Sequence, residues 1–204
     1  VTYADTAVSG SADTQTLALE GVTAGTFTAA AASTGGVETL AITSSGTARN
    51  VLTGITDATT LKTISVAGTQ AATLGTLGAS VTSVNASGNS GGVTLTTGNA
   101  TAAVTGSTGA DAISVTAALT TGSVDAGDGT DSLVLVDSIA SGGAAVADTI
   151  IASATNGAKF TNFETLNISH TDAGNADPVT AYANRSQDVS LVSGITTVGL
   201  TTYA

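Results

Sequence analysis

Two aspartates and the glycines around them are the strongest candidates for chemistry in this sequence. Residues 106–114 and 126–134 each follow the nonapeptide pattern G-G-x-G-x-D-x-U-x, with one small residue replacing one of the first two glycines. In this pattern the glycines allow a tight turn whose carbonyls point inward, the aspartate supplies a hard oxygen ligand, and the apolar residue starts a buried strand. The two segments therefore predict calcium-binding turns.

The spacing of the two segments strengthens this prediction. Asp111 and Asp131 occupy the same position of the pattern, so they are as far apart along the chain as the segments themselves. If one coil of a parallel β-solenoid takes about 20 residues, the two turns stack directly and a cation fits between them. We predict that both aspartates give carboxylate oxygens to one calcium ion and that main-chain carbonyls complete its ligands. The carbonyls are expected from the turns around Gly106, Thr108, Gly127 and Gly129.

The charge balance around these turns also favours a bound cation. Residues 63–158 contain six aspartates and no Lys, Arg or His. Asp125 and Asp128 lie close to Asp131 in sequence and are candidates to support its site or to form a neighbouring one. Such a cluster repels itself unless water or a cation neutralises it. The alternative is that these aspartates form Asx turns in solvated loops.

Composition limits the fold and the class of partner. The chain has 204 residues, 25 glycines, 42% hydrophobic residues but only 3% aromatic ones, and no cysteine. Small β-branched residues suit narrow stacked coils better than a wide two-sheet sandwich. A net charge of −11 argues against nucleic acid and anionic membrane as partners. There is also no run of about 18 apolar residues that would predict membrane insertion.

Internal repetition supports a solenoid. Twelve apolar residues can be chosen as strand centres, and the six steps from Leu74 to Leu133 cover 59 residues, so half a coil takes about ten. We predict an all-β parallel β-solenoid of about 20 residues per coil, forming one domain over 1–204 with almost no helix. Surface excursions are expected near 138–159 and 169–188. The chosen residues are Leu17, Phe27, Leu40, Val51, Ile64, Leu74, Val84, Val93, Val104, Ile113, Val124 and Leu133.

Two further features are interpreted as structural. Phe160 and Phe163 are two of the three phenylalanines, and we expect them to fill the core of a wider coil. Glu164 in FETL repeats the setting of Glu38 in VETL, which indicates one recurring position in a rung, meaning a strand with its turn, and not an acid catalyst. His170, Asp172 and Asp177 could form a second metal site, but a lone histidine in a polar loop is usually solvated.

The runs GSTGADAISV, VDAGDGTDSLVLVD and FTNFETLNIS, within residues 105–169, resemble RTX-type surface-layer proteins of Gram-negative bacteria. The resemblance implies a right-handed, calcium-stabilised solenoid that leaves the cell by a type I pathway and assembles with further copies of itself on the cell surface. It places any attachment to cell-surface polysaccharide in regions outside this segment. The sequence shows no basic stretch followed by an apolar run that would predict a secretory signal peptide, and we expect the chain to be a fragment of a longer protein.

Other function classes fit the sequence less well. There is no G-x-S-x-G elbow, P-loop, H-E-x-x-H or cysteine nucleophile, and one histidine with four Lys and Arg residues leaves little for acid–base work, so no enzyme is predicted. The repeat or spacer region of a secreted RTX adhesin or toxin would use the same coils. An ice-binding solenoid would repeat Thr-x-Thr at one position, and Thr94-Leu95-Thr96 does not recur in this way.

Overall fold

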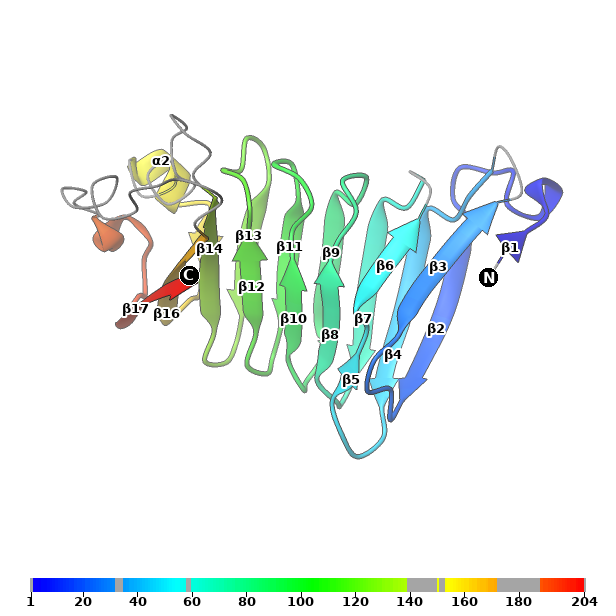
Figure 1. Ribbon diagram of the computed structural model, residues 1–204, viewed down its shortest axis with the longest axis horizontal. Helices are drawn as coiled ribbons and strands as arrows, with labels where there is room; N and C mark the ends of the chain where they lie inside the picture. The colour runs from blue at the N-terminus through cyan, green and yellow to red at the C-terminus, as the bar shows by residue number, and fades with distance from the viewer. Residues whose placement is uncertain are drawn as a thin grey trace.

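Short strands that alternate apolar and small polar residues wind into a parallel β-solenoid of about five turns, with about 22 residues per turn and almost no helix. The computed structural model describes residues 2–31, 35–57, 60–138, 150, 153–171 and 188–203. The strands stand side by side along the long axis in chain order, from the N-terminal to the C-terminal end (Figure 1). The predicted fold class is therefore confirmed.

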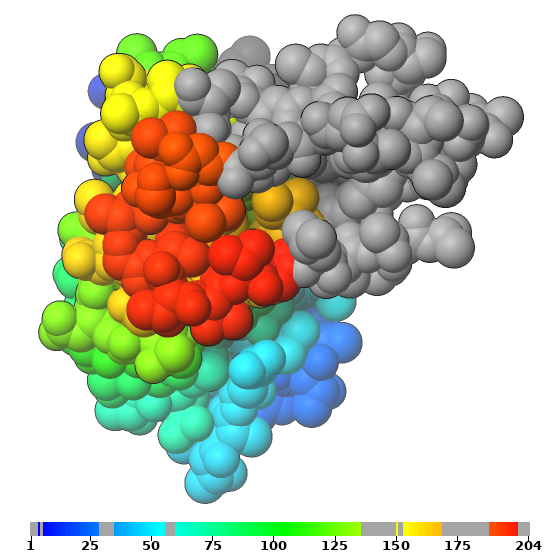
Figure 2. Space-filling view, turned by 90° about the vertical axis from the view of Figure 1, so that its left-hand side faces the viewer, coloured from blue at the N-terminus to red at the C-terminus, as the bar shows by residue number. Residues whose placement is uncertain are grey.

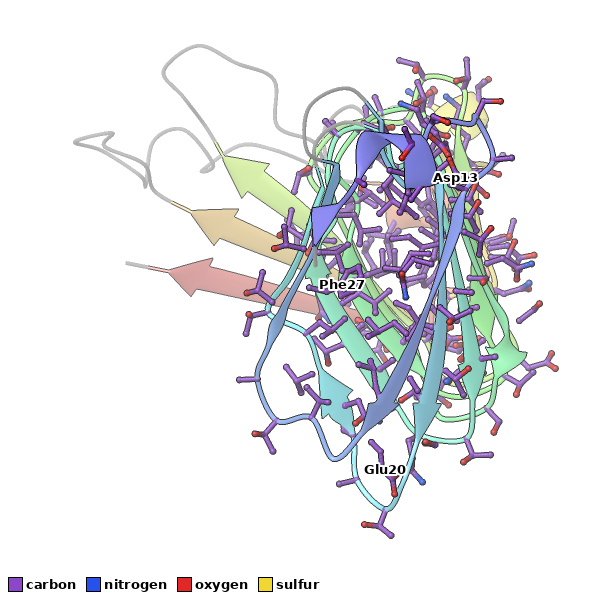
Figure 3. All side chains as sticks on the ribbon, turned by 90° about the vertical axis from the view of Figure 1, so that its right-hand side faces the viewer. Asp13, Glu20 and Phe27 are labelled. Carbon is purple, nitrogen blue, oxygen red and sulfur yellow. The ribbon has the colours of Figure 1, made fainter. Side chains whose placement is uncertain are left out.

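The described strands form two parallel sheets that face each other across the core (Figure 3). The ten-stranded sheet contains, in spatial order, β1 (Thr2–Tyr3), β3 (Thr26–Ala31), β6 (Gly54–Asp57), β8 (Ala72–Thr76), β10 (Val93–Thr96), β12 (Ala112–Val115), β14 (Ser132–Ser138), β16 (Thr165–Thr171) and β17 (Thr197–Tyr203), with β5 (Asn50–Val51) paired to β8. The seven-stranded sheet contains β2 (Thr14–Glu20), β4 (Thr39–Ser45), β7 (Thr63–Gly68), β9 (Ser83–Asn89), β11 (Ala103–Ser107), β13 (Ser123–Gly127) and β15 (Phe160–Thr161).

The length of a coil changes along the solenoid. In the centre, Ala103 pairs with Ser83 on one side and with Ser123 on the other, so successive coils there have equal lengths. At the N-terminal end, Thr39 pairs with Thr14, which is a longer step along the chain. The predicted period therefore describes the central coils, up to the two calcium-like turns, whereas the first coils and the coils after Asp131 are longer.

Aligned columns of apolar side chains fill the interior. All twelve strand centres chosen from the sequence lie in strands. In the seven-stranded sheet, one buried column consists of Leu40, Ile64, Val84, Val104, Val124 and Phe160. In the other sheet, Leu95, Ile113, Leu133 and Leu166 are aligned and buried. Val93 is also buried but pairs with Ala72, so Leu95 is the strand centre in register with Ile113.

Short helical segments lie at the two ends of the solenoid. Near the C-terminal end, the α-helix α2 (Ala154–Gly157) and the 3₁₀ helix η2 (Val189–Leu191) contact each other (Figures 1 and 2). A second 3₁₀ helix, η1 (Asp5–Ala7), lies at the N-terminal end.

Phe160 and Phe163 are fully buried, which confirms that they belong to the core.

The predicted excursions fall partly outside the described residues. These residues omit 139–149, 151–152 and 172–187, so Asp172 and Asp177 lie outside them. His170 lies in β16, which continues to Thr171. Among the helices that the structure describes, none has the length and apolar character needed to cross a membrane.

Candidate metal centre

The two predicted turns lie in neighbouring coils. One joins β11 to β12 and contains Asp111, and the other joins β13 to β14 and contains Asp131. On the strands that flank the turns, Val104 pairs with Val124 and Ala112 with Ser132, so the two turns are held in register. The stacking of the two aspartates, which their equivalent positions in the two segments predict, is what the structure shows.

The carboxylate of Asp111 is buried and is fully engaged by protein donors. Its Oδ1 accepts hydrogen bonds from the Val93 N–H of the preceding coil, at 2.6 Å, and from the Ser107 hydroxyl, at 2.7 Å. Its Oδ2 accepts one from the Ser107 N–H at 2.6 Å. These three bonds compensate the loss of hydration, because bonds to an ionised acceptor are stronger than neutral ones.

Gly106 makes room for this carboxylate. A Cβ at residue 106 would lie 2.4 Å from Asp111 Oδ2 and 2.0 Å from the Ala126 carbonyl oxygen of the next coil. No side chain fits there without displacing the backbone. The glycine of the motif is therefore required by close approach of the aspartate and of the neighbouring chain.

Asp131 lies in an equivalent position but has fewer partners. It is 1% exposed, and its Oδ1 accepts a hydrogen bond from the Asp111 N–H at 2.7 Å. Within the described part of the chain, its Oδ2 is buried without a hydrogen-bond partner. Burial raises the pKa of the Asp131 carboxyl to about 6; the hydrogen bond from Asp111 opposes this, and the charges of Asp111, Glu164 and Asp128 add to it.

The remaining predicted residues occupy the outside of the same turns. Asp125 is partly exposed, and its Oδ1 accepts hydrogen bonds from the Gly127 N–H at 3.1 Å and the Asn162 amide at 2.7 Å. Asp128 is exposed, and its N–H donates to the Ser107 carbonyl at 3.2 Å. Thr108 and Gly129 are also exposed. The turns thus combine two buried aspartates with more accessible ones.

Glu164 is a member of this site that the sequence analysis did not assign to it. It comes directly before β16, as Asp111 and Asp131 come directly before β12 and β14. Its Oε2 accepts a hydrogen bond from the Asp131 N–H at 2.7 Å. Asp111, Asp131 and Glu164 form what we call the acidic ladder, in which each carboxylate accepts a backbone N–H of the preceding coil.

Glu164 and Glu38 make similar hydrogen bonds, but they precede strands of different sheets. Glu38 comes directly before β4 of the seven-stranded sheet, and its Oε2 accepts a hydrogen bond from the Asp13 N–H at 2.8 Å. Asp13 and Glu38 therefore reproduce the main-chain pairing of Asp131 and Glu164. The pairs differ at the aspartate: Asp13 is only half-buried, and its Oδ2 accepts a hydrogen bond from the Gly10 N–H at 3.0 Å.

The acidic ladder fits a hard cation at one point only. The buried Asp131 Oδ2 is an acceptor that no protein donor serves among the described residues, which is the environment that a cation would compensate. Asp111 offers no comparable oxygen, since three donors already engage its carboxylate. No three His, Cys, Asp or Glu side chains converge as a metal-binding group within the part of the chain that the structure describes. A cation at Asp131 would therefore need main-chain oxygens or water among its ligands.

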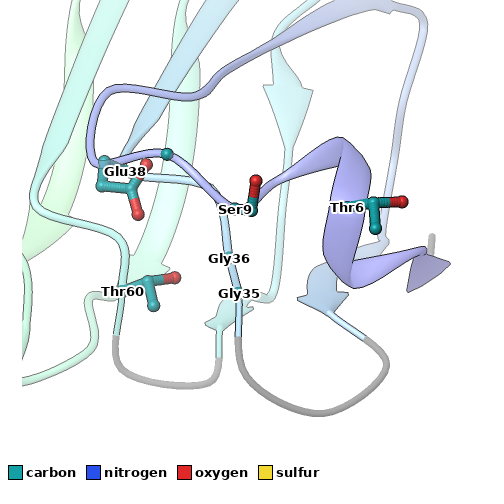
Figure 4. Close-up of a pocket in the computed structure, with 7 residues that line it drawn as sticks. Thr6, Ser9, Gly35, Gly36, Glu38 and Thr60 are labelled. Atoms are coloured by element: carbon teal, nitrogen blue, oxygen red, sulfur yellow. The ribbon is translucent and has the colours of Figure 1, made fainter.

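A separate hollow lies at the N-terminal end of the solenoid (Figure 4). Its volume is about 340 Å³, and Glu38 is the charged residue in its lining. The other lining residues are Thr6, Ser9, Gly10, Gly35, Gly36 and Thr60. Hydroxyl groups and glycines thus surround one carboxylate there, and none of the residues predicted to bind calcium takes part.

Comparisons of the chain with protein-family models, with curated proteins and with solved structures found no match.

Proposed function

We propose that this chain is a calcium-stabilised structural segment of a self-assembling bacterial surface layer, exported from the cell and located on its outer surface. The observation that carries the proposal is the stacking of two glycine- and aspartate-containing turns, which buries an Asp131 oxygen that has no donor among the described residues. A bound calcium ion would supply the missing positive charge at that oxygen. The acidic groups come from successive coils, so binding stabilises the stacked state over the extended chain.

The outer faces of the solenoid support a role in assembly. Small residues occupy one aligned position on the outer side of the seven-stranded sheet, where core residues alternate with them along each strand. This column consists of Thr14, Thr39, Thr63, Ser83, Ala103 and Ser123. A regular surface without long or charged side chains at this position allows close packing of neighbouring copies at a low cost in side-chain entropy.

Thermal unfolding of the purified chain, followed by far-ultraviolet circular dichroism, tests the calcium dependence. With calcium at a hundredfold excess over its dissociation constant, the folded state should gain about 2.7 kcal/mol. Magnesium at the same ionic strength is the control, because it prefers a tighter octahedral set of ligands. An unfolding midpoint that is the same in calcium and in calcium-free buffer would overturn the proposed calcium dependence.

Electron microscopy of the same preparations tests assembly. Ordered sheets should form with calcium and disperse when calcium is removed. A chain that calcium stabilises but that never forms sheets would instead fit the repeat or spacer region of a secreted RTX adhesin or toxin, because such a region needs the same coils and no lattice contacts. Sheets that form equally well without calcium would contradict the proposed coupling between binding and assembly.

A further inference from the structure

The protein donors are unequally distributed along the acidic ladder. The Asp111 carboxylate accepts three hydrogen bonds, from the Val93 N–H and from the N–H and hydroxyl of Ser107. The Asp131 carboxylate accepts one, from the Asp111 N–H, and its other oxygen is buried without a partner among the described residues. Two aspartates at the same motif position therefore differ in how many protein donors their carboxylates bind.

One residue accounts for this difference. Gly127 occupies the same motif position as Ser107 and pairs with it in the sheet. A glycine has no hydroxyl to offer, and the Gly127 N–H donates to Asp125 Oδ1 and not to Asp131. A serine cannot replace it, because Gly127 has φ = +90° and its Cβ would lie 2.2 Å from the Ser107 carbonyl oxygen. The backbone of the β13–β14 turn thus prevents a side chain at residue 127 from satisfying Asp131.

The acidic groups whose charges act on Asp131 come from the preceding coil, from its own turn and from the following coil: Asp111, Asp128 and Glu164. Glu164 Oε2 binds the Asp131 N–H at 2.7 Å, which fixes its carboxylate against the Asp131 turn. Glu164 is half-buried, and Asp128, which belongs to the Asp131 turn, is exposed. The charges of both residues act on Asp131. Negative charge therefore gathers on the side of Asp131 that faces the β15–β16 turn as well as on the side of Asp111.

We propose that calcium is bound on the C-terminal side of Asp131, by Asp131 and Glu164 with Asp128 nearby, and that Asp111 is a cap for its own turn and not a ligand. This inference rests on the proposed function, because the cation is the same. It moves the site from the pair of motif aspartates to the junction between the β13–β14 and β15–β16 turns. The Glu residue that precedes β16 then becomes a metal ligand, although it lies outside both nonapeptide segments.

Calcium titration of the full chain tests the assignment, using isothermal calorimetry and the luminescence of bound terbium. Glu164→Gln should weaken calcium binding by about tenfold or more, since it removes a charged oxygen ligand. Asp111→Asn should leave the calcium affinity within about threefold of that of the unmodified chain while lowering the thermal midpoint, because an amide cannot accept all three hydrogen bonds. Glu164→Asp should recover part of the lost affinity.

Glu38→Gln is the matched control. Glu38 makes the same bond to a backbone N–H of the preceding coil, at 2.8 Å, but among the described residues it has no buried unpartnered carboxylate beside it. Both glutamine variants keep a side-chain oxygen that can accept this hydrogen bond, and Glu164→Gln alone should change the calcium affinity. Equal affinities for these two variants would overturn the assignment, and this comparison remains decisive even if Asp111→Asn does not fold.

The outcomes separate this inference from the proposed function. If the unmodified chain binds neither calcium nor terbium, the calcium-stabilised function fails. If it binds calcium, and Asp111→Asn abolishes binding while Glu164→Gln does not, the function stands and the ion lies between the two motif aspartates. A loss confined to Glu164→Gln supports the site proposed above.

Discussion

Replacing Asp131 by asparagine should remove a pH-dependent loss of unfolding free energy from the calcium-free protein. The carboxyl is 1% exposed, and burial raises its pKa from the ordinary value of 3.8 to about 6. Asparagine has nearly the same shape, and its carbonyl oxygen can keep the hydrogen bond from the Asp111 N–H. The substitution therefore removes the charge and leaves the contacts of the side chain almost unchanged.

The direction and size of the effect follow from the raised pKa. Well below pH 3.8 the carboxyl is protonated in both the folded and the unfolded chain, so it has no effect on stability. As the pH rises from about 4 to about 6, the unfolded chain releases this proton first, and the free energy of unfolding falls. A tenfold difference in proton affinity corresponds to about 1.4 kcal/mol, so the ionised carboxylate costs at most about 3 kcal/mol at neutral pH.

Urea unfolding at pH 4, 5, 6 and 7 checks this reasoning, in buffers cleared of calcium with a chelating resin so that no pH-sensitive chelator is needed. The unmodified chain should lose stability relative to Asp131→Asn over this range, and the gap between the two chains should be smallest at pH 4. The difference between the chains isolates Asp131 from the general repulsion of a protein with a net charge of −11. Parallel pH profiles would refute the argument. In calcium the advantage of Asp131→Asn should disappear, because the variant lacks the ligand charge.

Two further predictions concern the solenoid itself. Gly106→Ala should lower the urea midpoint strongly, because its Cβ would lie 2.4 Å from Asp111 Oδ2. Gly54→Ala, which has open space at its Cβ, should change the free energy of unfolding by less than about 1 kcal/mol. Similar effects of the two substitutions would argue against this packing. Leu166→Ala should cost about 2–5 kcal/mol of unfolding free energy. Val198→Ala should cost much less, because Val198 is 48% exposed. Equal losses in urea titrations would show that the Val198 side chain is more buried than the structure indicates.

Much of the fold could be predicted because a solenoid repeats the same residue spacing in successive coils. The spacing of apolar residues identified strands of both sheets, and the equivalent positions of Asp111 and Asp131 in their nonapeptides indicated their stacking before any coordinates were considered. The sequence context shared by Glu38 and Glu164 also corresponds to one main-chain pattern. Each of these predictions depends on distances along the chain, which a regular coil converts directly into positions in space.

The features that could not be predicted depend on turn geometry. Two of these features arise where the backbone departs from the regular repeat. The first coils are longer, and a shift in register aligns Leu95, and not Val93, with Ile113. The sequence shows that Ser107 and Gly127 differ, but not that Ser107 engages Asp111 with two donors. Hydrogen bonds between turns depend on positions of a few tenths of an ångström, which residue spacing does not specify.

The acidic ladder makes the stacking of the last coils depend on a charge from outside the chain. Each carboxylate binds a backbone N–H of the preceding coil, so each ties two coils together. Residues 63–158 contain no basic residue, and the buried Asp131 oxygen has no donor among the described residues. Among the described groups whose charges act on Asp131, none is basic, so a proton or a cation from solution can neutralise it, and the two compete for the same oxygen. A neutral, calcium-poor compartment provides neither at sufficient concentration, so under the proposed function the stacked state is weakest before export and strongest at a calcium-rich cell surface.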